Sequence, residues 1–271
     1  MSINALTPVV EEIWRYPVKS LRGERLTEAR LDRRGLLGDR LWAVRDPDSG
    51  KLGSGKNSTR FRRFPGPPLL ELASRYPVEP GPDEVEPPFV VGRDGREYSV
   101  LDGSADLLVQ RHTGLRTLRV TRESDVDHFD DGPVSLLGTA TLRWVEENLP
   151  GTPIDRRRFR PNLLVRTTEP FAEEAWVGRR IRIGGGDISS DGSDSSSDGD
   201  SAGVELTVDM VLPRCVMVTM AQADLPDAPE VLKLLGTRAD QPVKLAVVGH
   251  PSRPGTIRVG DAVRLADPRE V

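Results

Sequence analysis

A single cysteine, Cys215, carries the most reactive side chain in this chain of 271 residues. It follows the cation Arg214, and a neighbouring positive charge favours the thiolate form of a thiol. A thiolate can act as a nucleophile or as a ligand for a soft metal ion. The alternative is a small buried hydrophobic side chain, because unpaired cysteines are among the most buried residue types. The residues that surround the cysteine must decide between these two roles.

The segment that positions Cys215 is residues 204–210, in which apolar and polar side chains alternate. The apolar side chains expected on one face are Val204, Leu206, Val208 and Met210. A period of two is typical of a half-buried strand. Pro213 has no amide hydrogen to donate, so it should end this strand or form a bulge in it. The sequence therefore places the thiol just beyond a strand break.

Cationic and hydrogen-bonding side chains occur beside turns in three other parts of the sequence. They are Lys19 and Ser20 after a predicted strand at residues 9–16, Arg40 before one at residues 41–44, and Arg160 and Asn162 before one at residues 163–165. Such residues beside turns are typical of anion sites. The alternative is an ordinary surface charge, which we favour for the basic and aromatic cluster at residues 59–64 taken alone.

The remaining pattern predicts a mainly β protein with a few helices. Glycine and proline number 26 and 23, which favours many turns between short strands. We expect a further strand at residues 176–183 and helices at residues 104–111, 135–149 and 228–235. Ser104 is the expected N-cap of the first helix and Ser135 the start of the second. The acidic run at residues 125–132 lacks the ligand spacing of an EF-hand and is expected to be a solvated loop.

Composition and charge argue against several classes of protein. The net charge of −4 gives no general attraction to nucleic acid. One cysteine cannot form an intramolecular disulfide, hold an iron–sulfur cluster or build a multi-cysteine zinc site. The three histidines lie far apart in sequence, which argues against a histidine-based metal site. No apolar run has the length of a membrane span and the first residues lack a secretory signal, so we expect a cytoplasmic protein with no membrane span.

Residues 186–203 form a low-complexity acidic segment dominated by Ser, Asp and Gly. Ile188 is its one large apolar residue, so the segment cannot contribute a hydrophobic core. We expect a disordered insert at the tip of a hairpin, without a catalytic role.

Six short motifs in this chain occur in a familiar order. They are YPVKS at residues 16–20, GLLGDRLW at 35–42, FRPNLLV at 159–165, WVGRRIRIG at 176–184, PRC at 213–215 and PGTIRVGD at 254–261. With these motifs the chain resembles the MOSC family, in particular members with an N-terminal MOSC β-barrel domain followed by the MOSC domain. The family includes the mitochondrial amidoxime-reducing component and bacterial reductases of N-hydroxylated compounds. The resemblance implies two such β-barrel domains, which we place at residues 1–120 and 121–271.

The resemblance also implies a molybdenum cofactor, a molybdopterin whose dithiolene sulfurs bind the metal. Cys215 matches the cysteine whose thiolate is the protein ligand of the molybdenum, and a soft thiolate suits a metal already bound by sulfurs. The other positions that match cofactor contacts are Lys19 and Ser20 at the phosphate end, together with Arg40, Arg160 and Asn162. Arg60 is a further candidate. We expect these residues to meet Cys215 in one cleft.

The reaction implied by the resemblance is a two-electron reduction that removes oxygen from small N-oxygenated or N-hydroxylated substrates while molybdenum cycles between Mo(VI) and Mo(IV). Because the chain has no ferredoxin module, a separate electron-donor protein is expected. One alternative is a non-redox carrier of the cofactor or of sulfur, as in the MOSC part of molybdenum cofactor sulfurase; another is an interaction protein with a degenerate pocket. Residues 218–221 read VTMA where related reductases carry a TTVD-like run, so the substrate stays open.

Overall fold

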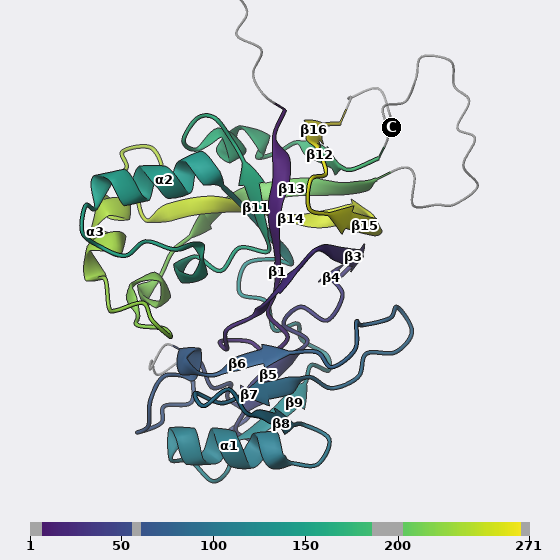
Figure 1. Cartoon of the computed structure of the whole chain (residues 1–271), viewed down its shortest axis with the longest axis vertical. Helices are drawn as coiled ribbons and strands as arrows, with labels where there is room; N and C mark the ends of the chain where they lie inside the picture. Colours follow the sequence, from purple (N-terminus) through teal and green to yellow (C-terminus); the bar gives the residue numbers. More distant parts are fainter. Residues whose placement is uncertain (1–6, 56–60, 186–202, 267–271) are drawn as a thin grey trace, which may run out of the picture.

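A large β-sheet occupies one half of the molecule, and smaller sheets with one helix occupy the other half (Figure 1). The computed structural model describes residues 7–55, 61–185 and 203–266. Strands outnumber helices in these ranges, which confirms the prediction of a mainly β protein with a few helices. Among these residues, no helix is both long enough and apolar enough to cross a lipid bilayer.

The large sheet contains eight strands whose spatial order differs from their order in sequence. From edge to edge they are β16 (Val263–Leu265), β12 (Arg180–Ile183), β13 (Val204–Pro213), β14 (Lys244–Arg253), β10 (Val134–Gly138), β11 (Leu163–Arg166), β1 (Val9–Arg15) and β2 (Glu24–Leu26). The sheet curls until β1, the second strand from one edge, meets the residues before β16 at the other edge. The Val10 N–H donates to the Asp261 carbonyl over 2.8 Å, and Val9 forms a bridge with Ala262. One face of the sheet is therefore enclosed, as in a barrel.

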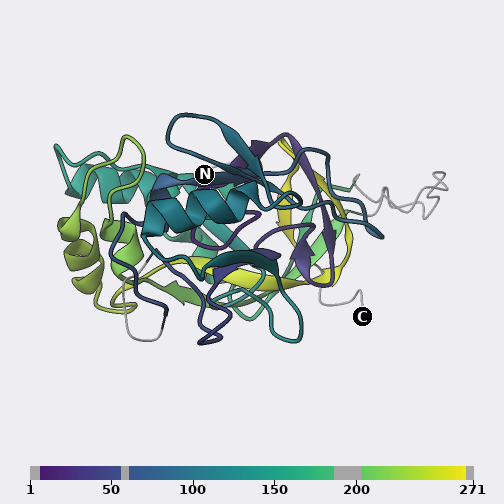
Figure 2. The same cartoon turned by 90° about the horizontal axis from the view of Figure 1, so that it is seen from below.

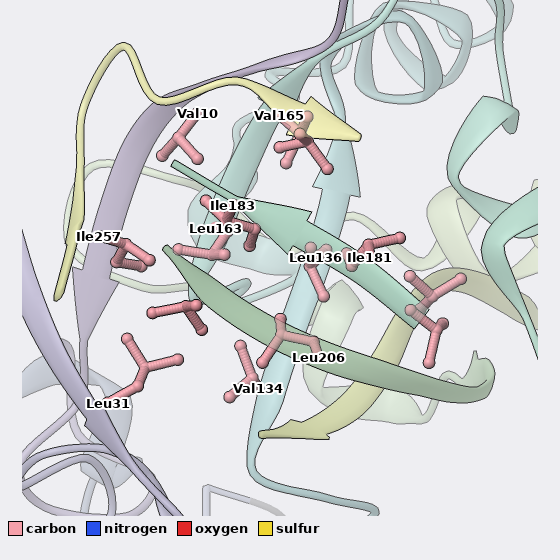
Figure 3. Packing of buried hydrophobic residues seen from close by; sticks show 14 of the residues in the cluster. Val10, Leu31, Val134, Leu136, Leu163, Val165, Ile181, Ile183, Leu206 and Ile257 are labelled. Carbon is pink, nitrogen blue, oxygen red and sulfur yellow. The ribbon is translucent and has the colours of Figure 1, made fainter. Parts of the chain in front are cut away.

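The central strands of this sheet are buried on both faces, which accounts for their apolar runs. On the enclosed face, Leu136 and Leu163 join a core of aliphatic side chains (Figure 3). The next residue on each strand, Leu137 or Leu164, points to the other face and packs with α2 (Thr139–Asn148) and α3 (Pro229–Gly236). The pleat of a strand, which alternates side chains between faces, thus supplies two cores from the same segments.

The other half of the molecule has a core of its own. Its strands are β5 (Trp42–Arg45) paired with β9 (Arg119–Arg122), and β6 (Ala73–Arg75), β7 (Phe89–Val91) and β8 (Glu97–Ser99). Helix α1 (Ser104–Thr113) lies beneath these strands in Figure 1 and in front of them in Figure 2. Ala105 and Val109 of α1 pack against Val44 and Val90 of the sheets.

A three-stranded sheet ties the beginning of the chain to its end. Strand β3 (Glu28–Asp32) lies between β4 (Gly35–Leu36) and β15 (Gly255–Arg258). Leu31 and Ile257 share the enclosed core of the large sheet. The first strands therefore pack with the C-terminal half of the chain, and the division at residue 120 stays a prediction.

The three predicted helices are present, but none begins quite as expected; α3 starts at Pro229, one residue after the expected start. Ser135 does not start a helix: it lies in β10, and α2 begins at Thr139. The apolar run before Thr139 forms a strand because it finds two partners far away in sequence, β11 and β14. Helix α1 is preceded by Gly103 as its N-cap, and Ser104 is its first residue.

The strand before Cys215 is longer than expected and is bulged. Its pairing with β14 shifts register between Val208 and Met210, so Met210 turns outward and is 37% exposed. Val211 then takes the buried position, as the extra residue of a β-bulge requires. Pro213 is the last residue of β13, and a further register shift lies between Val211 and Pro213.

Another predicted strand is shorter than expected. Of residues 176–183, only Arg180–Ile183 form a strand, β12, and Trp176 is the last residue of the 3-10 helix η3 (Ala172–Trp176). The acidic segment at residues 186–203 lies outside the described residues except for Gly203, and so does Arg60.

Candidate functional site

Five of the six predicted site residues lie in the wall of one pocket with a volume of about 290 Å³. They are Lys19, Ser20, Arg40, Arg160 and Cys215. These residues come from the loop after β1, the turn before β5, the segment between η2 (Arg156–Arg158) and β11, and the end of β13. Segments almost two hundred residues apart in sequence thus meet in one cleft. The pocket is at the lower end of the size range of ligand-binding pockets, about 300–1,000 Å³.

Asn162, the sixth residue, does not line the pocket but contacts residues that do. It is 1% exposed, and its Oδ1 atom accepts hydrogen bonds from the backbone and hydroxyl of Ser135 over 3.1 and 3.0 Å. The same oxygen accepts from Arg40 Nη1 over 3.4 Å, while Nδ2 donates to the Trp14 carbonyl over 3.2 Å. Asn162 therefore joins β1, β10 and one pocket arginine.

Three of the pocket residues have left-handed backbone conformations. The φ angles are 68° at Ser20, 50° at Arg40 and 52° at Arg160. Residues other than glycine seldom adopt this conformation, and such strain clusters at ligand-binding and active sites. All three residues lie outside the strands and line the same pocket.

Lys19 is a buried cation with described partners. Its Nζ atom donates to the His128 carbonyl and pairs with Asp130 Oδ1 over 2.9 Å. Both partners lie in the acidic run that the sequence indicated as a solvated loop, and Asp130, Asp131 and Gly132 line the pocket. Sequence reasoning missed these residues because an acidic run resembles any exposed loop.

Arg40 and Arg160 occupy one side of the pocket. Arg40 forms an ion pair with the fully buried Asp39, and its Nη2 atom donates to the Arg160 carbonyl over 3.3 Å. The Arg160 side chain has no hydrogen bond or ion pair with any described residue; its described contact is with the ring of Tyr16. Burial lowers the pKa of the Arg160 guanidinium to about 10, so it remains charged at neutral pH.

Arg214, next to the cysteine, was singled out only as a neighbour of the thiol. Its Nε atom donates to the Leu245 carbonyl over 2.8 Å and Nη1 to the Phe159 carbonyl over 3.1 Å. Its Nη2 atom is buried without a partner among the described residues. Burial lowers the pKa of Arg214 to about 10, and attraction to Cys215 acts in the opposite direction.

Cys215 follows β13 directly and flanks the 3-10 helix η4 (Val216–Thr219) on its N-terminal side. Its side chain is partly exposed and lines the pocket, so it is not the fully buried small hydrophobe of the alternative interpretation. Among the described residues, no group of three or more His, Cys, Asp or Glu side chains is placed to hold a metal ion. A metal bound to Cys215 would therefore need its other ligands from a partner such as a cofactor.

The pocket as a whole suits an anionic ligand that carries a soft metal. Five cationic side chains line it, Lys19, Arg40, Arg158, Arg160 and Arg214, against the two carboxylates of Asp130 and Asp131. The unpartnered Nη2 atom of Arg214 is a donor available beside the thiol. Forked guanidinium donors bind phosphate strongly, and a thiolate is the protein ligand that a soft metal prefers. The residues present therefore fit a metal cofactor with an anionic end.

Comparison with known proteins identifies the family of this chain. The protein named mitochondrial amidoxime-reducing component 1, from Mus musculus, is 26% identical over 299 residues, which cover 94% of this chain and 82% of that protein. The crystal structure of the YUAD protein from Bacillus subtilis covers 96% of each chain with a TM-score of 0.48 and 13% identity. The MOSC N-terminal beta barrel domain matches residues 7–67, and the MOSC domain matches residues 123–264. The chain belongs to the MOSC domain family.

Proposed function

We propose that this protein binds a molybdenum cofactor in the pocket around Cys215 and reduces small N-oxygenated substrates. The observation that carries the proposal is the meeting of one partly exposed thiol with five cationic side chains in a single pocket. Membership of the MOSC family and the name of the relative, an amidoxime-reducing component, support the same reading.

The residues of the pocket have distinct roles in this proposal. The Cys215 thiolate would hold the metal, because soft sulfur ligands suit molybdenum bound by dithiolene sulfurs. Lys19, Ser20, Arg40 and Arg160 would hold the phosphate and the polar pterin, and Asn162 would keep Arg40 in place. When bound, the cofactor supplies the two-electron chemistry that releases oxygen from nitrogen, while the protein supplies orientation and electrostatics.

The electrons are expected to reach the pocket from a separate electron-donor protein. A chain with one cysteine cannot hold an iron–sulfur cluster with its own thiolates. The partial exposure of Cys215 is compatible with delivery of electrons at the surface, because a fully buried centre would need a relay through the protein.

The test is to measure metal and pterin bound to the protein after expression in a host that makes the cofactor. We expect close to one molybdenum per wild-type chain and less than about a tenth of that in Cys215→Ala, since the substitution removes the one protein ligand. Arg182→Gln changes an arginine that does not line the pocket and pairs with Glu205, and it serves as a matched control that should retain the metal. Wild-type protein without molybdenum would contradict the proposal.

Activity is a second and separate readout. Loaded wild-type protein, supplied with a chemical electron donor, should convert hydroxylamines or amidoximes to the amine or amidine. Molybdenum bound without such reduction would instead favour the carrier of cofactor or sulfur.

A further inference from the structure

Tyr16 lies at the end of β1, directly under two arginines of the pocket. Its ring is 3% exposed, and its centroid is 4.2 Å from Arg160 Cζ and 4.8 Å from Arg40 Cζ. Both distances are well within the range of about 6 Å in which an aromatic face attracts a cation. One ring therefore contacts two guanidinium groups that come from segments 120 residues apart.

The polar groups of Tyr16 bind the same two segments. Its N–H donates to Asp39 Oδ1 over 2.7 Å, and its carbonyl accepts from the Arg40 N–H over 2.8 Å. Its hydroxyl donates to the carbonyl of Pro161, the residue after Arg160, over 3.2 Å. The ring thus contacts both left-handed residues, Arg40 and Arg160, while the backbone and hydroxyl bind the segments that carry them.

Two guanidinium groups beside one ring repel each other, and only Arg40 has a carboxylate partner, Asp39. No hydrogen bond or ion pair within the described residues fixes the Arg160 side chain, so the ring is its anchor. Burial raises the pKa of the Tyr16 phenol to about 12, which keeps it neutral at physiological pH. The attraction is therefore between the π face and the cations, with no phenolate to compete with an anionic ligand.

We propose that Tyr16 is a positioning residue that holds Arg40 and Arg160 as a preformed pair for the phosphate-bearing part of the pocket's ligand. The identity of that ligand rests on the proposed function, but the pairing itself does not. Preformed donors bind more tightly than mobile ones, because less side-chain freedom is lost on binding. Tyr16 acts through the arginines and needs no contact with the ligand.

The experiment measures binding of inorganic pyrophosphate to the full chain, expressed without cofactor, by calorimetry at fixed ionic strength. Tyr16→Leu keeps an apolar side chain but removes the ring, and we expect affinity to fall about tenfold. Tyr16→Phe keeps the ring and loses only the hydroxyl, so its affinity should stay within about threefold of wild type. Phe171→Leu removes a ring outside the pocket whose centroid lies 3.8 Å from Arg238 Cζ, and it should leave the affinity for pyrophosphate unchanged.

A measurement on the wild-type protein keeps the inference testable if Tyr16→Leu does not fold. In ligand-free protein, the Nε–Hε signals of Arg40 and Arg160 should show upfield shifts from the ring current in nuclear magnetic resonance spectra. Equal losses in Tyr16→Phe and Tyr16→Leu, unshifted signals, or no pyrophosphate binding by wild type would each overturn the inference. Wild-type protein that binds pyrophosphate but carries no molybdenum would contradict the proposed function and leave the role of Tyr16 standing.

Discussion

Arginine side chains cluster in two regions, around Glu205 and in the pocket, and the two clusters differ in whether each arginine has an acidic partner. Around Glu205 of β13, Arg182, Arg253 and Arg180 lie 3.1, 3.2 and 3.8 Å from one carboxylate. The carboxylate is 9% exposed, and the arginine side chains are between 19% and 35% exposed. Each cation in this region thus has an acidic partner and access to water.

Two of the pocket's cations, Arg160 and Arg214, lack such an acidic partner within the part of the chain that the structure describes. Arg160 has no acidic partner among the described residues, and Arg214 donates to two carbonyls and leaves one nitrogen unpaired. Burial lowers the pKa of both groups, which shows that their charge is held in the protein at a cost in free energy. A cluster of arginines therefore indicates a binding site where the fold leaves some of the charges without an acidic partner.

The largest effect is expected when one arginine charge is removed from each region. Arg160→Gln should weaken pyrophosphate binding about fiftyfold, because a hydrogen bond to a charged group is worth about 1.5–3 kcal/mol. Arg182→Gln should leave affinity within about twofold of wild type. Calorimetry on both variants measures the difference. Equal losses of affinity would show that Arg160 contributes no more to pyrophosphate binding than an arginine outside the pocket.

A buried and an exposed histidine, His128 and His250, offer a second comparison. His128, whose carbonyl holds Lys19, is 2% exposed, and neither ring nitrogen has a described partner. Burial lowers its pKa from 6.5 to about 4; Glu123 opposes this shift, and Arg45, Lys19 and Arg34 reinforce it. His250 on β14 is exposed and pairs with Asp209 over 3.0 Å.

The sign of the pH effect follows from the depressed pKa. The neutral form of His128 contributes stability that is fully present above pH 6.5 and is lost progressively as the pH falls from 6.5 to about 4. At pH 5 the loss is about 2 kcal/mol in free energy of unfolding. His128→Leu should remove this part of the difference between urea unfolding at pH 7 and pH 5, whereas His250→Leu should keep it. If the free energy of unfolding of His128→Leu depends on pH as that of wild type does, His128 is not the cause of this pH dependence.

The smallest effect expected is that of Asp130. Its carboxylate pairs with Lys19 over 2.9 Å in the pocket wall and is half exposed, so it competes with an incoming anion for the ammonium group. Asp130→Asn should strengthen pyrophosphate binding about threefold, in line with the modest strength of a partly exposed ion pair. Asp209→Asn, outside the pocket, is the matched control. Weaker binding by Asp130→Asn would mean that the carboxylate positions Lys19 for the ligand instead.

Much of the fold and the candidate site could be predicted from local patterns in the sequence. The alternation at residues 204–210 and the apolar run at residues 163–165 indicated strands that the structure contains as β13 and β11. The matched motifs singled out side chains as far apart as Lys19 and Cys215, which the structure places in one pocket. Whether these side chains hold a cofactor stays a prediction.

The rest depended on contacts between distant segments. Val134–Gly138 has an apolar run that fits a helix or a strand, and its pairing with β11 and β14 decides for the strand. The bulge that turns Met210 outward is set by register with β14. The left-handed backbone at Arg40 and Arg160 left no signal either, because arginine has no preference for that conformation.

The pairing of the first strands has a consequence for the synthesis of the protein. Strand β1 pairs with β11, and β3 pairs with β15, whose residues Gly255–Arg258 lie close to the end of the sequence. Contacts of such long sequence separation form late, after loop closure over most of the chain. The loop with Lys19 and Ser20 therefore gains its binding partners only after the segment that contains Cys215 has been synthesised. A ligand that contacts both Lys19 and Cys215 can bind only after that point.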